Sequence, residues 1–142
     1  MDGMRRGRGG DQRGAAAVEF ALVLPLLLML VFGIIDFGYL VNRSSMVNNA
    51  ARDAAREGSL HATSAEILAV ADDALSGVPG ASAEVTCTKP DGTACGVSYD
   101  TDAAAGGTVI VTVTYVHEMI TPISMVFGDS VDVSRTARMR IE

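Results

Sequence analysis

The sequence predicts an α+β fold, in which a long N-terminal transmembrane helix is followed by a second helix and a small antiparallel sheet. Three observations predict it: an uncharged apolar run near the N-terminus, a helical pattern that continues beyond it, and apolar–polar alternation in the C-terminal half. The chain has 142 residues, room for one small domain beyond the helix. It lacks tryptophan, so we expect a modest core of aliphatic residues and methionine.

The apolar run has no charged residue from Phe20 to Ile35 and closes at Asp36. Extended back to Ala15 it has 21 residues, close to the ~20 that a helix needs to cross a bilayer. Pro25 lies within it, and membrane helices tolerate proline, although it removes a backbone hydrogen bond and favours a bend. The run therefore predicts a single membrane-spanning helix.

The charge of the chain changes sign across this run. Residues 1–13 contain four arginines and two aspartates, a net charge of +2, whereas the whole chain carries −6 and the remainder therefore −8. This asymmetry predicts a single-pass protein of the cell (inner) membrane with a cytoplasmic N-terminus and an extracytoplasmic head. The acidic head also argues against nucleic acid as a partner, because phosphate binding needs a basic surface.

Three interpretations of the apolar segment are open. It is a plain signal anchor, a cleaved secretory signal, or a segment in which Glu19 has a specific role. A secretory signal is disfavoured because the small residues precede the apolar core instead of following it. A carboxylate in a membrane helix costs about 2–3 kcal/mol, less near the interface, so Glu19 either reaches the interface or has a partner. Cleavage after Gly14 would create that partner, a free amine on Ala15 of a neighbouring subunit.

The stretch GAAAVEF, from Gly14 to Phe20, resembles the processing site of type IV pilin-like proteins. In that pattern a basic leader ends in glycine, and the mature chain has glutamate at its fifth position and an aromatic residue at its sixth. Counted from Ala15, these positions are Glu19 and Phe20. Residues 13–58 more narrowly resemble the TadE-like pseudopilins of tight-adherence (Flp/Tad) pilus systems.

The resemblance implies cleavage after Gly14 by a prepilin peptidase, with Gly14 and Ala15 as the processing site. Glu19 and Phe20 would set the register between packed subunit helices. The implied partners are the lipid bilayer, the peptidase, and other pilins or pseudopilins of the assembly machinery, with the protein in the membrane or in the pilus. The chain is longer than the major pilin of such systems, which favours a minor pseudopilin in a pilus used for adhesion.

The resulting domain organisation has four parts: a cleaved leader at 1–14, a transmembrane helix at 15–38, an extracytoplasmic continuation at 39–58, and an α+β head at 59–142. Gly58 is predicted to stop the helix just after Glu57. A stripe of small residues in the continuation permits close packing, and we favour the head over neighbouring subunits as its partner. The stripe consists of Leu40, Val47, Ala50, Ala51, Ala54 and Ala55.

Within the head, Thr63 and Glu66 have capping-box spacing and predict a helix to about Leu75. Alternation predicts strands at 81–88, 106–119 and 131–142, and less clearly at 96–100. The segment 120–130 is left open as a loop, a short docked helix, or a segment resting on the membrane surface. A helix followed by a sheet is also the general plan of type IV pilins.

Two cysteines, Cys87 and Cys95, flank a turn-rich stretch. A disulfide in an oxidising compartment is the leading interpretation, followed by free thiols and then by a metal site, for which too few ligands are near.

No catalytic motif is present, so we predict no enzymatic activity, cofactor, metal or small-molecule substrate. His117 and Glu118 are adjacent on a predicted strand, so their side chains should point to opposite faces. His117 is expected to be a surface or hydrogen-bonded residue, and the acidic pairs Asp72–Asp73 and Asp100–Asp102 to be solvated turns.

The main hypothesis is therefore a minor pseudopilin that supports assembly or initiation of a tight-adherence pilus. The alternative is an uncleaved, single-pass, membrane-anchored binding module of the cell envelope.

Overall fold

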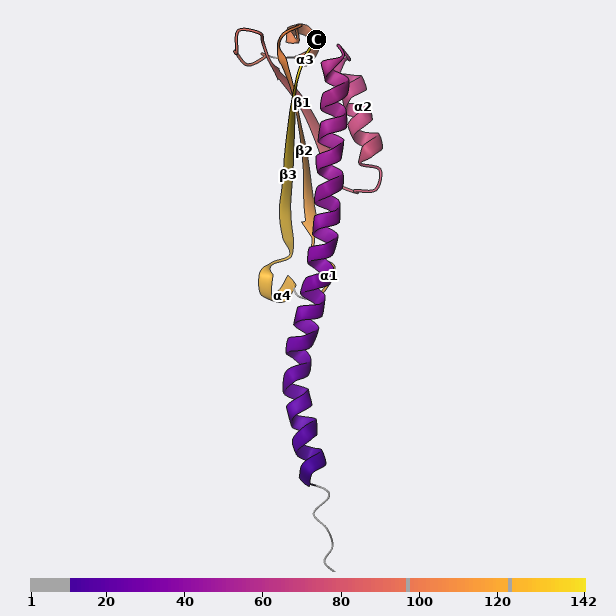
Figure 1. Ribbon diagram of the computed structural model, residues 1–142, viewed down its shortest axis with the longest axis vertical. Coiled ribbons are helices and arrows are strands. Elements are labelled where there is room, and N and C mark those ends of the chain that lie inside the picture. Colours follow the sequence, from indigo (N-terminus) through magenta and orange to yellow (C-terminus); the bar gives the residue numbers. More distant parts are fainter. Residues whose placement is uncertain (1–10, 97, 123) are drawn as a thin grey trace, which may run out of the picture.

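The computed structural model describes residues 11–96, 98–122 and 124–142. It has a 49-residue helix, a second helix, and a three-stranded antiparallel sheet that lies beside the upper half of the long helix (Figure 1). The α+β prediction is confirmed. The elements are α1 (Asp11–Ser59), α2 (Ser64–Ala74), β1 (Ser82–Thr88), α3 (Tyr99–Asp102), β2 (Thr108–Glu118), α4 (Ser124–Phe127) and β3 (Ser130–Arg140).

Helix α1 runs without interruption through Pro25 and Gly38. In the lower part of α1, the apolar side chains from Val18 to Ile35 are mostly exposed. Among the described residues, α1 is the only helix that is long and apolar enough to cross a membrane. Figure 1 shows this part projecting alone below the head. Exposure of so much apolar surface in water is unfavourable, which is consistent with a single-pass membrane anchor.

The sheet has the order β1-β2-β3, with β2 in the centre. The predicted strand at 106–119 is present as β2, and its alternation places Val109, Val111 and Val113 on one face, where each is fully buried. The register opposes Val111 to Val85 of β1 and to Ala137 of β3. Because the side-chain period of a strand is two, this register sends the apolar set of the sheet toward the helices.

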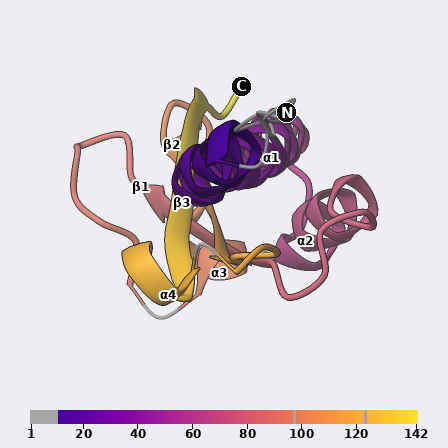
Figure 2. The ribbon, with the colours of Figure 1, turned by 90° about the horizontal axis from the view of Figure 1, so that it is seen from below.

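The small-residue stripe of α1 packs on its own head. Val47, Ala50 and Ala54 are fully buried, and they belong to one core cluster with the β2 valines and with Ile67 of α2. Figure 2, which views the molecule from below, shows α1 against the sheet and α2 beside it. Alanine side chains let the helix backbone approach the sheet closely, so the head and the upper half of α1 share one core.

The capping box of α2 is present as predicted. The Glu66 carboxylate accepts a 2.8 Å hydrogen bond from the backbone N–H of Thr63, and the Thr63 hydroxyl accepts one from the Glu66 N–H. These bonds satisfy two backbone donors that the first helical turn would otherwise leave free.

The predicted helix stop at Gly58 is wrong, because α1 continues to Ser59 and Gly58 lies within its last turn. A Cβ atom at Gly58 would lie 2.7 Å from a Val109 methyl carbon and 2.9 Å from Ile67 Cδ1. The glycine is therefore required for close packing of α1 on β2 and α2. The turn into the left-handed region occurs three residues later, at His61.

The weaker strand prediction for 96–100 is also wrong, because Tyr99 and Asp100 begin helix α3; Val97 lies outside the described residues. The Tyr99 ring is buried, and its hydroxyl donates to the carbonyl of Gly58 at 3.1 Å. Asp100 accepts two 2.6 Å hydrogen bonds from Ser64 at the start of α2. These tertiary contacts override a five-residue alternation that no neighbouring strand supports.

Candidate processing site and helix–head contacts

The predicted processing residues lie at the free end of α1. Gly14, Ala15, Glu19 and Phe20 are all exposed, and Phe20 retains 63% of its accessible surface. Apart from its chain neighbours and the adjacent helix backbone, no atom of the described residues lies within 4 Å of the position that a Cβ would occupy at Gly14. The described part of the head does not cover this end of the helix, so another protein in the membrane could reach the Gly14–Ala15 bond and Glu19. Their processing and registration roles remain predictions.

Asp36 joins the lower part of α1 to the head through hydrogen bonds. Its side chain is only 3% exposed, and one carboxylate oxygen accepts a 2.9 Å hydrogen bond from the backbone N–H of Ile120. The other oxygen accepts a hydrogen bond from the Thr121 hydroxyl. A buried carboxylate is stable only when its oxygens are satisfied, and these two donors come from the connection between β2 and β3. We call this arrangement the Asp36 clamp.

A second group of contacts lies one to two helical turns above the clamp. The Arg43 guanidinium sits over the Tyr39 ring at 4.8 Å, and it donates a 2.7 Å hydrogen bond to the Tyr39 hydroxyl. On the other side of the helix, Arg135 of β3 donates to the Ser44 hydroxyl at 2.8 Å. The Arg43–Tyr39 contact lies within α1, whereas the Arg135–Ser44 hydrogen bond joins α1 to β3 and helps to set the rotation of the helix relative to the sheet.

His117 is a residue of β2, and its side chain lies close to Tyr39 of α1. It is 1% exposed, and its ring centroid is 6.2 Å from that of Tyr39 and 6.1 Å from that of Tyr115. Glu118 points to the opposite face and is exposed, as predicted. The expectation that His117 is a surface or hydrogen-bonded residue is wrong, because within the described residues neither ring nitrogen has a hydrogen-bond partner. The imidazole is packed near the rings of Tyr39 on α1 and Tyr115 on β2 and makes no hydrogen bond to the described residues.

Replacing His117 with leucine should therefore maintain or increase the free energy of unfolding of the head. Leaving a buried polar group without a partner costs about 1–3 kcal/mol, and leucine fills a similar volume without that cost. His117→Ala, the size control, should lose about 2 kcal/mol through the cavity that it leaves. Thermal unfolding of both variants checks this. A leucine variant destabilised as much as the alanine variant would show that the imidazole has a partner.

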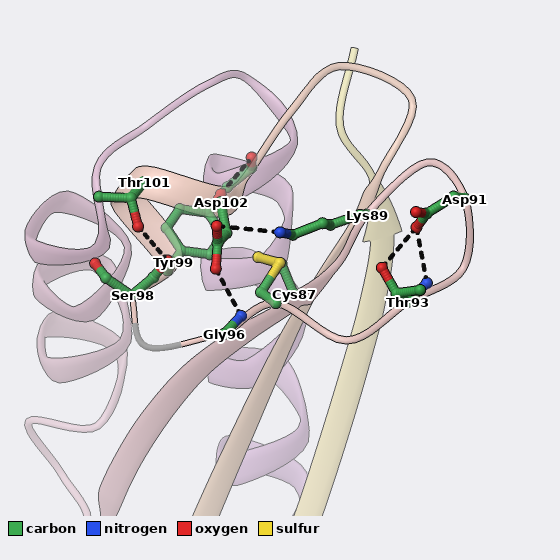
Figure 3. Close-up of a disulfide and its surroundings, with 11 residues drawn as sticks. Cys87, Lys89, Asp91, Thr93, Gly96, Ser98, Tyr99, Thr101 and Asp102 are labelled. Carbon is green, nitrogen blue, oxygen red and sulfur yellow. Dashed lines mark hydrogen bonds and ion pairs between the residues drawn. A yellow bond between two sulfur atoms is a disulfide. The ribbon is translucent and has the colours of Figure 1, made fainter.

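At the far end of the head, Cys87 and Cys95 form a disulfide, which confirms the leading interpretation. It closes the base of the loop that follows β1 (Figure 3). At the loop tip, Asp91 accepts from the Thr93 backbone N–H at 3.0 Å and from its hydroxyl at 2.7 Å. These bonds stabilise the charged carboxylate, so the Thr93 hydroxyl and N–H hold the pKa of Asp91 below its ordinary value.

The acidic pair at α3 has a structural role that the sequence analysis did not identify. Asp102 accepts a 2.6 Å hydrogen bond from the Gly96 N–H and pairs with Lys89 at 3.3 Å, as Figure 3 shows. Both contacts lower the pKa of Asp102, the Gly96 hydrogen bond most. The Ser64 hydroxyl and N–H likewise lower the pKa of Asp100. The two carboxylates hold α3 against the disulfide loop and against α2.

The structure does not gather the predicted residues into one site. The processing residues lie near one end of α1 and the disulfide at the opposite end of the head, separated by most of a helix of about 70 Å. Among residues 11–96, 98–122 and 124–142, no three His, Cys, Asp or Glu residues are grouped as metal ligands. The arrangement is that of a membrane segment carrying a rigid head.

Sequence reasoning missed the Asp36 clamp. The sequence identified Asp36 only as the residue that closes the apolar run, and Thr121 was not singled out. The available signal was a single carboxylate directly after the apolar run, together with a threonine in an otherwise apolar connection. Nothing in the sequence pairs residues that are 85 positions apart, so only the tertiary structure identifies the contact.

The TadE-like protein family model matches residues 14–56. The match covers the processing motif, the apolar run and the whole small-residue stripe, and it confirms the resemblance of this segment to TadE-like proteins. No curated protein and no solved structure matches the chain.

Proposed function

We propose that this chain, whose residues 14–56 match the TadE-like family model, is a minor pseudopilin of a tight-adherence pilus system. It supports assembly or initiation of the pilus and has no enzymatic role. The observation that carries the proposal is the GAAAVEF motif, which lies inside the family match and at the exposed end of α1. A prepilin peptidase cuts after Gly14 and leaves Ala15 as the mature N-terminus.

In this proposal each part of the chain has one task. Residues 1–14 form a cytoplasmic leader that is removed, and 15–38 span the membrane. Residues 39–58 carry the helix into the head at 59–142 on the extracytoplasmic side. The geometry supports this division, because the lowest side-chain hydrogen bonds that join α1 to the described part of the head are those at Asp36. Below that level the apolar face of α1 is free to pack against lipid or other pilin helices.

Glu19 supplies the specificity of helix packing. After cleavage, the Ala15 ammonium of one subunit pairs with the Glu19 carboxylate of its neighbour, and Phe20 packs beside the pair. Two opposite charges in a low-dielectric environment attract strongly, and removal of one partner of a buried pair costs about 3–5 kcal/mol. The pair therefore favours one axial register between helices over the others.

The mature N-terminus tests this proposal. We expect mass spectrometry of the protein from its native membrane to find a chain that begins at Ala15, because cleavage of the Gly14–Ala15 bond removes the basic leader. Expression in a host without a prepilin peptidase is the control and should yield the uncut chain. A native chain that still begins near Met1 would contradict the proposal and favour an uncleaved, membrane-anchored binding module. A start near residues 36–45 would indicate a secreted protein.

A further inference from the structure

The membrane boundary on α1 can be located from the chain itself. The apolar run from Ala15 to Ile35 has 21 residues, a length of about 30 Å in a helix and thus about the thickness of the hydrocarbon core. Asp36 is the next residue, so the Asp36 clamp lies at the edge of the hydrocarbon when α1 spans the bilayer.

The clamp brings the connection between β2 and β3 to this same level. Ile120 and Thr121 bind Asp36, and the Met119 N–H donates to the Asp129 carbonyl at 2.9 Å, which closes the neck of the connection. Figure 1 shows α4 of this connection at the lower end of the head, and Figure 2 shows that it is set apart from α1. The connection is therefore held at the membrane edge at both its neck and its contact with the helix.

The apolar surface of the head is concentrated at this end. Outside α1, the large hydrophobic side chains exposed in the described part of the chain are Leu60, Val116, Ile120 and Met125. Three of these four lie in or just before the connection, and Met125 is 89% exposed. At the opposite end, the disulfide loop exposes polar groups such as Asp91 and Thr93. A head surrounded by water on all sides gains nothing from such a distribution.

We infer that the described part of the connection, residues 119–122 and 124–129, forms a second membrane contact, in which Ile120 and Met125 enter the lipid interface at the level where α1 leaves it. The occupant of this surface is lipid, because the hydrogen bonds of Ile120 and Thr121 to Asp36 hold the connection at the level of the hydrocarbon edge. Glu118 and Asp129, which flank the connection, are acidic and would repel anionic headgroups. The contact therefore depends on the apolar side chains and not on anionic headgroups. It fixes the tilt of the head relative to the membrane, because two separated points define an orientation where one helix does not.

This inference requires that α1 spans a membrane, but it does not require cleavage after Gly14 or a role in a pilus. The two proposals can therefore fail separately: the mature N-terminus tests the first, and depth of the connection in lipid tests the second.

A single-tryptophan series can measure that depth, because the chain has no tryptophan of its own. Ile120→Trp and Leu60→Trp are matched reporters, with 60% and 59% of the native side chain exposed. Leu60 directly follows the last residue of α1, about 36 Å from Asp36 along the helix axis, and is therefore well outside the lipid. Leu22→Trp, within the apolar run, reports that the full-length chain has inserted. The proteins are reconstituted in vesicles of phosphatidylethanolamine and phosphatidylglycerol, with and without lipids brominated near the headgroup end of the acyl chain.

We expect the Ile120→Trp emission to be blue-shifted and quenched by brominated lipid, and its quenching by aqueous acrylamide to be several-fold weaker than for Leu60→Trp. The lipid quenching should persist when phosphatidylcholine replaces phosphatidylglycerol. Met125→Trp provides an independent reporter if Ile120→Trp does not fold. When Asp36→Ala is introduced into the Ile120→Trp protein, lipid quenching of the tryptophan should weaken, because the connection loses its hydrogen bonds to α1. Unchanged lipid quenching would contradict the inference, because the introduced tryptophan itself would then have drawn the connection into the lipid.

Equal acrylamide quenching at positions 120 and 60 would overturn the inference by placing the connection in water. Protection from both quenchers would also overturn it, because protein would then cover the patch. If Leu22→Trp is not quenched by lipid, α1 does not span the bilayer and the inference fails with it.

Discussion

Replacement of Gly14 with isoleucine is expected to leave the basic leader attached and to abolish the role of the protein in pilus assembly. The position is exposed, with no atom within 4 Å of the added Cβ, so isoleucine is accommodated without strain in the protein itself. The effect arises at the peptidase, whose access to the Gly14–Ala15 bond a branched side chain obstructs. Immunoblotting for the uncut chain and counting of surface pili are the measurements.

Gly38→Ile is the matched control for this variant. Gly38 lies in the same helix and likewise has no atom within 4 Å of an added Cβ, but it is 24 residues from the predicted cut. It should be processed normally. Normal pilus number with an uncut Gly14→Ile protein would contradict the pseudopilin proposal, because assembly would not need the mature N-terminus.

Glu19→Gln separates cleavage from helix registration. The glutamine side chain keeps the shape of the glutamate but cannot attract the Ala15 ammonium of a neighbour. We expect the leader still to be removed, while crosslinking between this chain and its pilin partners falls strongly, as loss of one charge of a buried pair requires. Unchanged crosslinking would show that Glu19 only reaches the membrane interface.

Removal of the disulfide, with Cys87→Ala and Cys95→Ala together, is expected to lower the free energy of unfolding of the head by about 2.5 kcal/mol, the chain-entropy value for so short a loop. The bond joins residues only eight positions apart, and one of them, Cys87, lies within β1. In a head of this size, the loss corresponds to a decrease of about 10–20 °C in Tm. Circular dichroism of the full-length protein in vesicles, followed with temperature, measures it.

Two controls accompany the disulfide variant. A reducing agent should lower the Tm of the natural protein to that of the double variant, and it should not change the double variant. Lys89→Met removes the ion pair with Asp102 but keeps the loop closed, and its effect should be below about 1 kcal/mol because Lys89 is partly exposed. An unchanged Tm after reduction would show that hydrogen bonds at Asp91 and Asp102 hold the loop without the covalent bond.

Local pattern was sufficient for most of the helices and strands. The strong alternation at 106–119 predicted β2 and its buried valines, because a strand with one buried face must repeat with period two. The Thr63–Glu66 spacing predicted the start of α2, since the capping contacts lie within four residues of one another. Prediction failed at Gly58 and at 96–100, where packing and hydrogen bonds from distant residues determine the backbone.

The sequence by itself predicted a membrane helix near the N-terminus and the resemblance of residues 14–56 to TadE-like proteins, because an apolar run of the right length, a preceding basic segment and the GAAAVEF motif are contiguous properties of the chain. Only the tertiary structure decided where the head joins that helix. Asp36, Ile120 and Thr121 come together because folding returns the β2–β3 connection to α1, across 85 residues of chain. The reason is physical: burial of Asp36 is tolerated only where donors from another element satisfy its carboxylate, and no local pattern specifies those donors.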